Sequence, residues 1–239
     1  TAASWGLPLA PGTSLPVDLV IPVSVDGAPD QEVRIQGDIL DAFVVNGSAR
    51  LASVRYSRPR PSFRLAAAVR VAAAHLARPD LSWSAVIVSR GEGSKTTAGL
   101  GVQLAGAGDA LAVHARQLLA MAVQLNAWAR RDAVPFFDRA SLPLSKGALG
   151  AADSALSDDL EFDAYATLLW PNIDIDTLLQ LPPLPTDPAA IGGADRPAAS
   201  RAMLTAQWVW GTFAACIDEI DVTGAIVSAN GDDGAGDDE

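Results

Sequence analysis

A predicted hairpin carries residues at the spacing of a metal-dependent nuclease site. Its first segment contains Asp38 and Asp41, its turn is Asn46-Gly47, and its second segment contains Ser53-Val54-Arg55. Asn-Gly between two apolar runs is a strong hairpin signal. In a nuclease with this layout, an Asp on the first strand and an acid-x-Lys triplet on the second bind Mg²⁺ and position the attacking water. Serine is no substitute for an anionic ligand, and the guanidinium of arginine is too basic to exchange protons near neutral pH. The sequence therefore predicts the shape of a nuclease without its catalytic residues.

Asp38 and Asp41 are the two carboxylates left in this hairpin. They are three residues apart, and successive strand residues alternate between faces, so we expect the two side chains to point to opposite or skewed faces. Two carboxylates on different faces cannot easily bind one ion. We therefore expect no cofactor, and Mg²⁺ only if the chain is an active nuclease that uses Asp38 or Asp41 with an acid from elsewhere.

Other residues that could perform chemistry have simpler interpretations. An acidic stretch, predicted to be helical and solvated, contains Asp153, Asp158, Asp159, Glu161 and Asp163. His75 and His114 lie in predicted helices without a Cys or His companion at zinc-binding spacing, so they are interpreted as ordinary helix residues. The glycines before Lys95-Thr96 do not have the spacing of a nucleotide-binding P-loop. The chain also has no Gly-x-Ser-x-Gly nucleophile motif.

The distribution of charge is more informative than its total. The net charge is −11, which argues against a general nucleic-acid-binding protein. Residues 42–79 nevertheless contain no acid and seven arginines, which are Arg50, Arg55, Arg58, Arg60, Arg64, Arg70 and Arg78. A local basic surface of this kind is a candidate phosphate contact, or else an ordinary solvated or interface surface. The candidate binding residues for DNA or a partner are Arg50, Arg55, Arg58, Arg60 and Arg64.

Composition indicates a globular chain with a substantial core. Of its 239 residues, 49% are hydrophobic, and no run of about 18 apolar residues without charge predicts a membrane span. The single cysteine, Cys216, rules out an internal disulfide and suits a reducing cytoplasm. The chain begins at Thr1 without a signal-peptide pattern, so we expect a cytoplasmic piece of a longer protein.

Periodicity predicts strands first and helices later. The predicted strands cover residues 16–25, 32–35 and 40–45 (as one strand or two), 49–56, 83–89 and 100–104. The predicted helices cover residues 62–77 with Ser62 as N-cap, 109–131, about 146–170, 174–181 and 199–218. Trp208, Trp210 and Phe213 in the last helix belong either to the core or to a subunit interface, and the core is the preferred expectation. This order favours an α/β fold with a mixed sheet flanked by helices.

The chain divides into five predicted parts. These are an N-terminal lead-in (1–15), a nuclease-like α/β domain (16–180), a Pro/Gly-rich linker (181–198), a C-terminal helix packing on the domain (199–222) and an acidic disordered tail (223–239).

The order of these features resembles the C-terminal domain of RecC, the gamma subunit of exodeoxyribonuclease V, in its actinobacterial form. The resemblance covers roughly residues 15–215. The matching stretches are Gly37-Asp38-Ile39, Val54-Arg55-Tyr56-Ser57-Arg58, Leu81-Ser82-Trp83-Ser84-Ala85-Val86-Ile87-Val88, the helix at 109–131 with Val134-Pro135-Phe136-Phe137, and Leu168-Leu169-Trp170-Pro171. No single one of these stretches is diagnostic, and their order and spacing carry the resemblance.

The resemblance implies a PD-(D/E)XK-like, restriction-endonuclease-like core whose active site has decayed, with additional C-terminal helices. Such a domain is a non-catalytic partner of RecB-like and RecD-like subunits in a DNA-end-processing complex for double-strand break repair and recombination. It helps to join the subunits and to route separated DNA strands. Two rivals stay open: an active Mg²⁺-dependent nuclease, and a protein-interaction domain with no DNA role.

Overall fold

The computed structural model describes residues 13–24, 31–45, 48–91, 97–191 and 200–222. Its strands are β1 (Thr13–Val23), β2 (Gln31–Val45), β3 (Ser48–Val54), β4 (Ser82–Arg90), β5 (Thr97–Leu104) and β6 (Ile217–Asp221). Its helices are α1 (Pro61–Ala77), α2 (Asp109–Ala129), α3 (Ser141–Ser145), α4 (Leu149–Phe162), α5 (Ala164–Leu169), α6 (Ile175–Gln180), the 3₁₀ helix η2 (Ala189–Ile191) and α7 (Arg201–Cys216).

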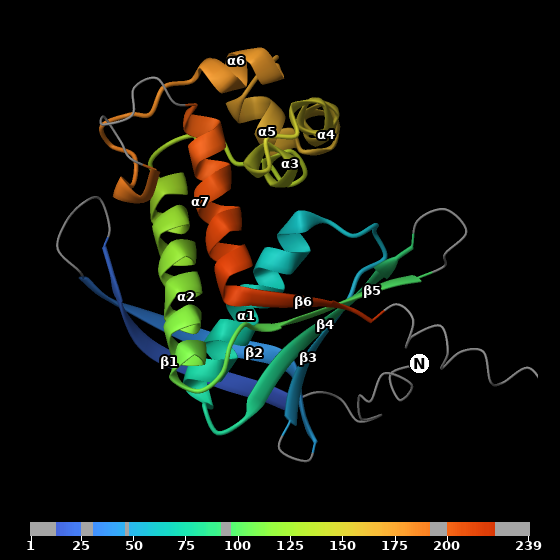
Figure 1. Ribbon diagram of the computed structural model, residues 1–239, viewed down its shortest axis with the longest axis vertical. Helices are drawn as coiled ribbons and strands as arrows, with labels where there is room; N and C mark the ends of the chain where they lie inside the picture. The colour runs from blue at the N-terminus through green and yellow to red at the C-terminus, as the bar shows by residue number, and fades with distance from the viewer. Residues whose placement is uncertain (1–12, 25–30, 46–47, 92–96, 192–199, 223–239) are drawn as a thin grey trace, which may run out of the picture.

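The strands of the described residues form one mixed sheet in the order β1-β2-β3-β4-β5-β6. All neighbouring strands are antiparallel except β3 and β4, which run parallel and are connected through α1 (Figure 1). A parallel pair needs such a crossover because its second strand must restart at the same end of the sheet. The predicted α/β class with a mixed sheet flanked by helices is confirmed.

A bulge interrupts the pairing of β1 with β2. Thr13 pairs with Ala42 and Leu15 pairs with Ile39, so β2 has one more residue than β1 between these two pairs. Asp41 lies in this extra length, and its φ of 59° is in the left-handed region. Aspartate is among the few residues other than glycine that adopt this conformation readily, and a bulge changes the direction of nearby side chains.

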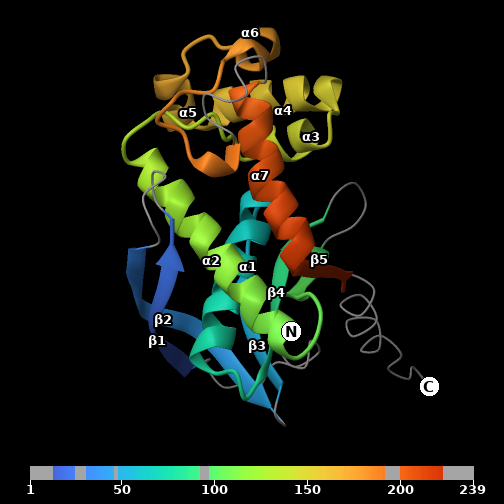
Figure 2. The same ribbon diagram turned by 60° about the vertical axis from the view of Figure 1, so that its left-hand side comes forward.

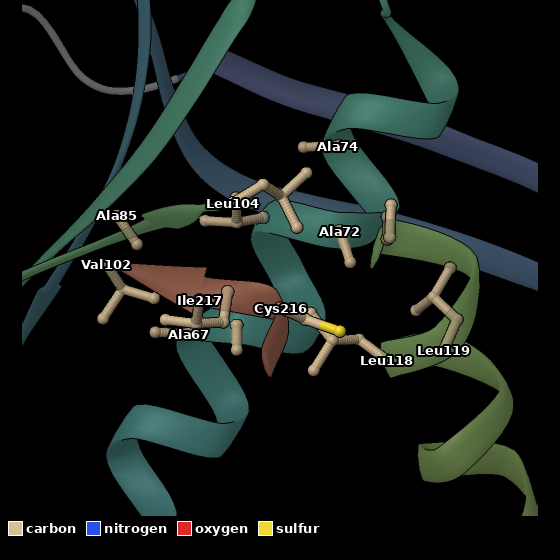
Figure 3. Packing of buried hydrophobic residues seen from close by; sticks show 14 of the residues in the cluster. Ala67, Ala72, Ala74, Ala85, Val102, Leu104, Leu118, Leu119, Cys216 and Ile217 are labelled. Atoms are coloured by element: carbon tan, nitrogen blue, oxygen red, sulfur yellow. The ribbon is translucent and has the colours of Figure 1, made fainter. Parts of the chain in front are cut away.

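Helices α1, α2 and α7 lie together on one side of the sheet (Figure 1). The core between them contains small α1 side chains such as Ala67 and Ala72, together with Leu118 of α2 and Cys216 of α7 (Figure 3). Buried alanines allow α1 to approach the sheet closely, because they leave only a methyl group between the backbones.

Helices α3–α6 and the N-terminal half of α7 form a second, smaller hydrophobic cluster beyond the end of the sheet (Figure 2). Long α7 belongs to both clusters, since Ala202 and Ala206 pack in the second and Val209 and Phe213 in the first. The two cores therefore share one continuous helix.

A buried ion pair joins the proline-rich segment to α7. Arg201 Nη2 donates to Asp187 Oδ1 at 2.6 Å, and Arg201 Nε donates to Asp187 Oδ2 at 2.9 Å. The guanidinium also lies over the Trp128 ring, with its carbon 5.0 Å from the ring centroid, and Asp187 accepts from the Leu184 N–H at 2.7 Å. The described part of the predicted 181–198 linker thus contains a buried anchor.

Most predicted elements are confirmed, including the strands at 49–56 and 83–89 and the helices at 62–77 and 109–131. The segments 32–35 and 40–45 belong to one strand. Trp210 and Phe213 are buried, and Trp208 packs against the same core, as predicted.

Three predictions about helices are wrong. The single helix expected over 146–170 is two helices, because Asp163 ends α4 and its side chain caps α5 by accepting from the Tyr165 and Ala166 N–H groups. The last helix ends at Cys216, and the chain continues into β6 on β5. Ser62 is not the N-cap of α1: the helix begins at Pro61 after Arg60, and the Ser62 N–H donates to Asp138 at 2.9 Å.

Some predictions fall outside the described residues. They concern most of the lead-in, the turn at 46–47, the loop at 92–96 with Lys95-Thr96, residues 192–198 of the linker, and the acidic tail at 223–239.

Candidate functional site: the β3–α1–β4 cavity

The hairpin that contains the candidate site is formed by β2 and β3. Their ladder pairs Ala42 with Leu51 and Val45 with Ser48. Ser53 lies near the end of β3, and Arg55 follows that strand directly. The Arg55 N–H donates to the main-chain oxygen of Val88 at 2.7 Å, which fixes Arg55 beside the neighbouring strand β4.

A cavity of about 40 Å³ lies between β3, β4 and the first half of α1. Its lining residues are Leu51, Ser53, Arg55, Phe63, Ala66, Ala67, Arg70, Ala85 and Ile87. The volume has room for a few water molecules and not for a nucleoside. Ser53 and Arg55, the residues compared with the acid-x-Lys triplet of nucleases, therefore line a common small space.

Two guanidinium groups border this cavity from opposite elements. Arg55 directly follows β3, and its guanidinium carbon lies 5.3 Å from the centre of the Phe63 ring, a cation–π contact. Arg70 comes from α1, and its Nη2 donates to the main-chain oxygen of Leu40 at 2.5 Å. Burial lowers the pKa of Arg70 from its ordinary value, Asp41 opposes this shift, and the positive charge of Arg55 adds to it. Asp41 and Arg55 both act electrostatically on Arg70.

The two aspartates of β2 have different surroundings. Asp38 is exposed and accepts a hydrogen bond from the Ser14 hydroxyl of β1 at 2.9 Å, so its carboxylate is turned to the neighbouring strand. Asp41 is exposed at the bulge, and its negative charge acts to raise the pKa of Arg70. Neither aspartate lines the cavity. The structure thus brings Ser53 and Arg55 together at the cavity, and Asp41 is related to it only through its electrostatic effect on Arg70.

This arrangement favours an anion over a cation. A divalent metal needs several oxygen ligands with negative charge, whereas two guanidiniums repel it and attract phosphate or carboxylate groups. Across the part of the chain that the structure describes, no three His, Cys, Asp or Glu side chains are grouped as a metal site would require. Arginine beside an apolar ring and a serine hydroxyl can bind an oxyanion through charge-assisted hydrogen bonds.

The other candidate arginines do not form one uniform basic surface. Arg50 and Arg58 are exposed. Arg60 forms an ion pair with Asp138 at 3.6 Å, and Arg64 forms one with Glu219 at 3.3 Å. Both carboxylates come from distant parts of the chain, so these ion pairs could not be predicted from the sequence.

Arg64 and Glu219 also border a second, open cavity of about 400 Å³. It lies between α1, α3, α7 and β6, and Trp210, Phe213 and Ile217 contribute to its lining. The Arg64–Glu219 pair thus links α1 to the edge strand of the sheet.

The acidic stretch is solvated as predicted except at one residue. Asp159 is buried, and its Oδ2 accepts from the main-chain N–H groups of Arg139 and Ala140 at 2.8 and 3.0 Å. Burial raises the pKa of Asp159, although these two hydrogen bonds act against the shift. Asp159 therefore holds the loop between α2 and α3.

The two histidines have structural surroundings. His75 is buried in α1, and burial lowers its pKa. His114 Nδ1 lies 2.9 Å from the main-chain oxygen of Ala105, a contact between α2 and the loop that precedes it. Their interpretation as ordinary helix residues agrees with these positions.

Comparison with protein-family models, with curated proteins and with solved structures finds no match for this chain. Among the described residues, no helix is both long and apolar enough to cross a bilayer. The function is therefore argued from the site itself.

Proposed function

We propose that this chain is a non-catalytic scaffold and DNA-handling domain of a RecC-like gamma subunit in a RecBCD-type exodeoxyribonuclease V complex. One observation carries the proposal: Arg55 and Arg70 border the cavity at the end of β3 where a nuclease would need carboxylates. A pair of cations there is incompatible with binding Mg²⁺ and compatible with binding the backbone of DNA.

The surrounding architecture supports a PD-(D/E)XK-like core. Such a nuclease has an Asp on one strand of a hairpin and the acid-x-Lys triplet on the next. In this chain Asp41 lies on β2 and the degenerate triplet Ser53-Val54-Arg55 lies at the end of antiparallel β3. This order of strands and residues supports the proposal that the placement of the site is retained while its ligands have changed. The proposed decay is a change of side chains within a nuclease-like fold.

The proposed DNA contact uses the exposed arginines around the cavity. Arg55 is held over Phe63, and Arg58 is exposed on the loop between β3 and α1. A guanidinium that is already positioned loses less conformational freedom on binding a phosphate oxygen. The contact would be independent of base sequence, because it addresses the backbone alone.

A protein-interaction domain with no DNA role is the second candidate function. Two of the five candidate arginines, Arg60 and Arg64, already have carboxylate partners, and the net charge of the chain is −11. Both features reduce the attraction of the chain for DNA. An active nuclease has less support, because Asp38 is bonded to Ser14 and Asp41 lies beside a guanidinium.

Two measurements on the full chain separate these functions. The first is the affinity for fluorescently labelled single-stranded and forked DNA between about 50 and 200 mM salt, where phosphate contacts weaken binding steeply. The second is co-purification with the RecB-like and RecD-like subunits of the same organism. Assembly with salt-sensitive DNA binding is the expected result. Assembly without DNA binding supports the interaction domain, and failure to assemble contradicts the proposal.

A further inference from the structure

Helix α5 exposes an apolar surface in place of burying it. Phe162 at the end of α4 is 65% exposed, and Tyr165, Leu168 and Leu169 of α5 are 79%, 75% and 56% exposed. Tyr165, Leu168 and Leu169 are spaced i, i+3 and i+4, so they share one side of the helix. A surface helix normally turns this stripe to the core. No residue of α5 is buried.

The charges around the apolar surface are mainly negative, and one guanidinium, that of Arg139, lies over the Phe162 ring. Residues 149–180 contain seven acids and no lysine or arginine. These acids are Asp153, Asp158, Asp159, Glu161, Asp163, Asp174 and Asp176, and all except Asp159 are exposed. Contiguous exposed apolar side chains with a charged border are typical of protein interaction sites.

The surface is held in place before any partner binds. Asp163 caps α5 by accepting from Tyr165 N–H at 2.9 Å and from Ala166 N–H at 3.2 Å. The guanidinium of Arg139 lies 5.8 Å from the centre of the Phe162 ring. Ala166 of α5 packs against the second hydrophobic cluster, which attaches the helix to the domain. Little conformational entropy would therefore be lost on docking.

From these observations we propose that Phe162, Tyr165, Leu168 and Leu169 are the docking surface for a partner subunit. The partner would present an apolar groove bordered by lysine and arginine, into which α5 lays its outer side. This inference rests on the proposed function, since it names the chemistry of the surface by which the domain joins its complex.

Charge decides against the other occupants. A second copy of the chain would bring an acidic border against an acidic border, and DNA would bring phosphates against it. Like charges placed together at an interface are unfavourable. The apolar surface of α5, with its acidic border, and the guanidiniums of the β3–α1–β4 cavity would then bind different partners.

The test measures binding of the full chain to the RecB-like and RecD-like subunits, singly and together. The variant is Tyr165→Ser with Leu168→Ser, two exposed positions where folding tolerates polar residues. The matched control is Val20→Ser with Val113→Ser, whose residues are 57% and 48% exposed on β1 and α2. We expect the variant to lose at least tenfold in affinity and the control less than twofold. Glu161→Gln with Asp176→Asn should weaken the dependence of association on salt.

Each other outcome overturns the inference in a recognisable way. If the Tyr165→Ser/Leu168→Ser variant binds the subunits as tightly as the wild type does, the docking surface is elsewhere and only this inference fails. If the isolated wild type is a dimer in sedimentation and the α5 variant is a monomer, the occupant is a second copy. If the wild type joins neither subunit, the proposed function fails together with the inference.

Discussion

Arg70 of α1 donates to the main-chain oxygen of Leu40 at 2.5 Å, at the bulge where β2 turns through Asp41. The hydrogen bond joins α1 to β2, the strand on which a nuclease of the proposed class would have its metal-binding aspartate. The positive charge of Arg70 is also within electrostatic range of Asp41 on that strand. A cation in this position opposes metal binding and gives the site the opposite electrostatic preference.

The first prediction separates arginines that contact DNA from arginines that stabilise the fold. Arg55→Gln and Arg58→Gln should each weaken binding to single-stranded DNA about tenfold, because each removes a charge-assisted hydrogen bond to phosphate. Each should also reduce the slope of log affinity against log salt by about one. Arg60→Gln is the control, since its ion pair with Asp138 already neutralises it, and it should change DNA affinity little. An equal effect of all three substitutions would contradict the proposed contact.

The second prediction concerns the buried pair of Asp187 and Arg201. Asp187→Ala should lower the free energy of unfolding by about 3 to 5 kcal/mol, because it leaves the guanidinium buried without its carboxylate. The measurement is urea unfolding followed by tryptophan fluorescence. Asp187→Leu combined with Arg201→Met should recover most of the loss, since a buried ion pair can be replaced by apolar groups of similar size. A loss below about 1 kcal/mol for Asp187→Ala would show that water reaches the site.

The third prediction is a pH dependence caused by His75. Burial lowers its pKa in the folded state, so the unfolded state binds more protons between that lowered pKa and the ordinary value of about 6.5. The contribution of neutral His75 to stability is therefore complete above about pH 6.5 and is lost as the pH falls towards the folded pKa. His75→Leu should flatten the free energy of unfolding between about pH 7.5 and 5.5. An unchanged slope in the variant would assign the dependence to other groups.

The fourth prediction tests the start of α1. Asp138→Ala should lower stability by about 1 kcal/mol, because it removes the acceptor of the Ser62 N–H and the negative charge at a helix N-terminus. Asp138→Asn keeps an acceptor oxygen and should lose about half as much. Ser62→Ala should have little effect, since its side chain does not cap the helix. Thermal unfolding followed by circular dichroism measures all three, and a larger effect of Ser62→Ala than of Asp138→Ala would contradict this account of the helix start.

The parts of the fold that depend on neighbouring residues were predictable from the sequence. The alternation in β3, the apolar run of β4 and the helical spacing of α2 are local patterns, and the structure confirms them. The helix boundary at Asp163 was not predicted. It also has a local signal, since an aspartate at an N-cap can accept from the N–H groups two and three residues further along, here those of Tyr165 and Ala166.

The parts that depend on distant contacts were not predictable. Residues 217–221 become a strand because β5 offers its free edge, and no local pattern indicates that pairing. Arg70 appeared among seven arginines without distinction, and its place at the cavity depends on the docking of α1 against β3 and β4. The ion pairs of Arg60 and Arg64 likewise depend on tertiary structure. The sequence thus predicts local elements, and not the tertiary contacts that surround each side chain.

The central claim is tested most directly by cleavage of end-labelled single- and double-stranded DNA with Mg²⁺ and with Mn²⁺. Asp41→Asn is the informative variant, because asparagine tolerates the left-handed backbone at this position and removes only the charge. We predict no metal-dependent cutting by the wild type or by the variant. Cutting by the wild type that Asp41→Asn abolishes would contradict the account and establish an active nuclease.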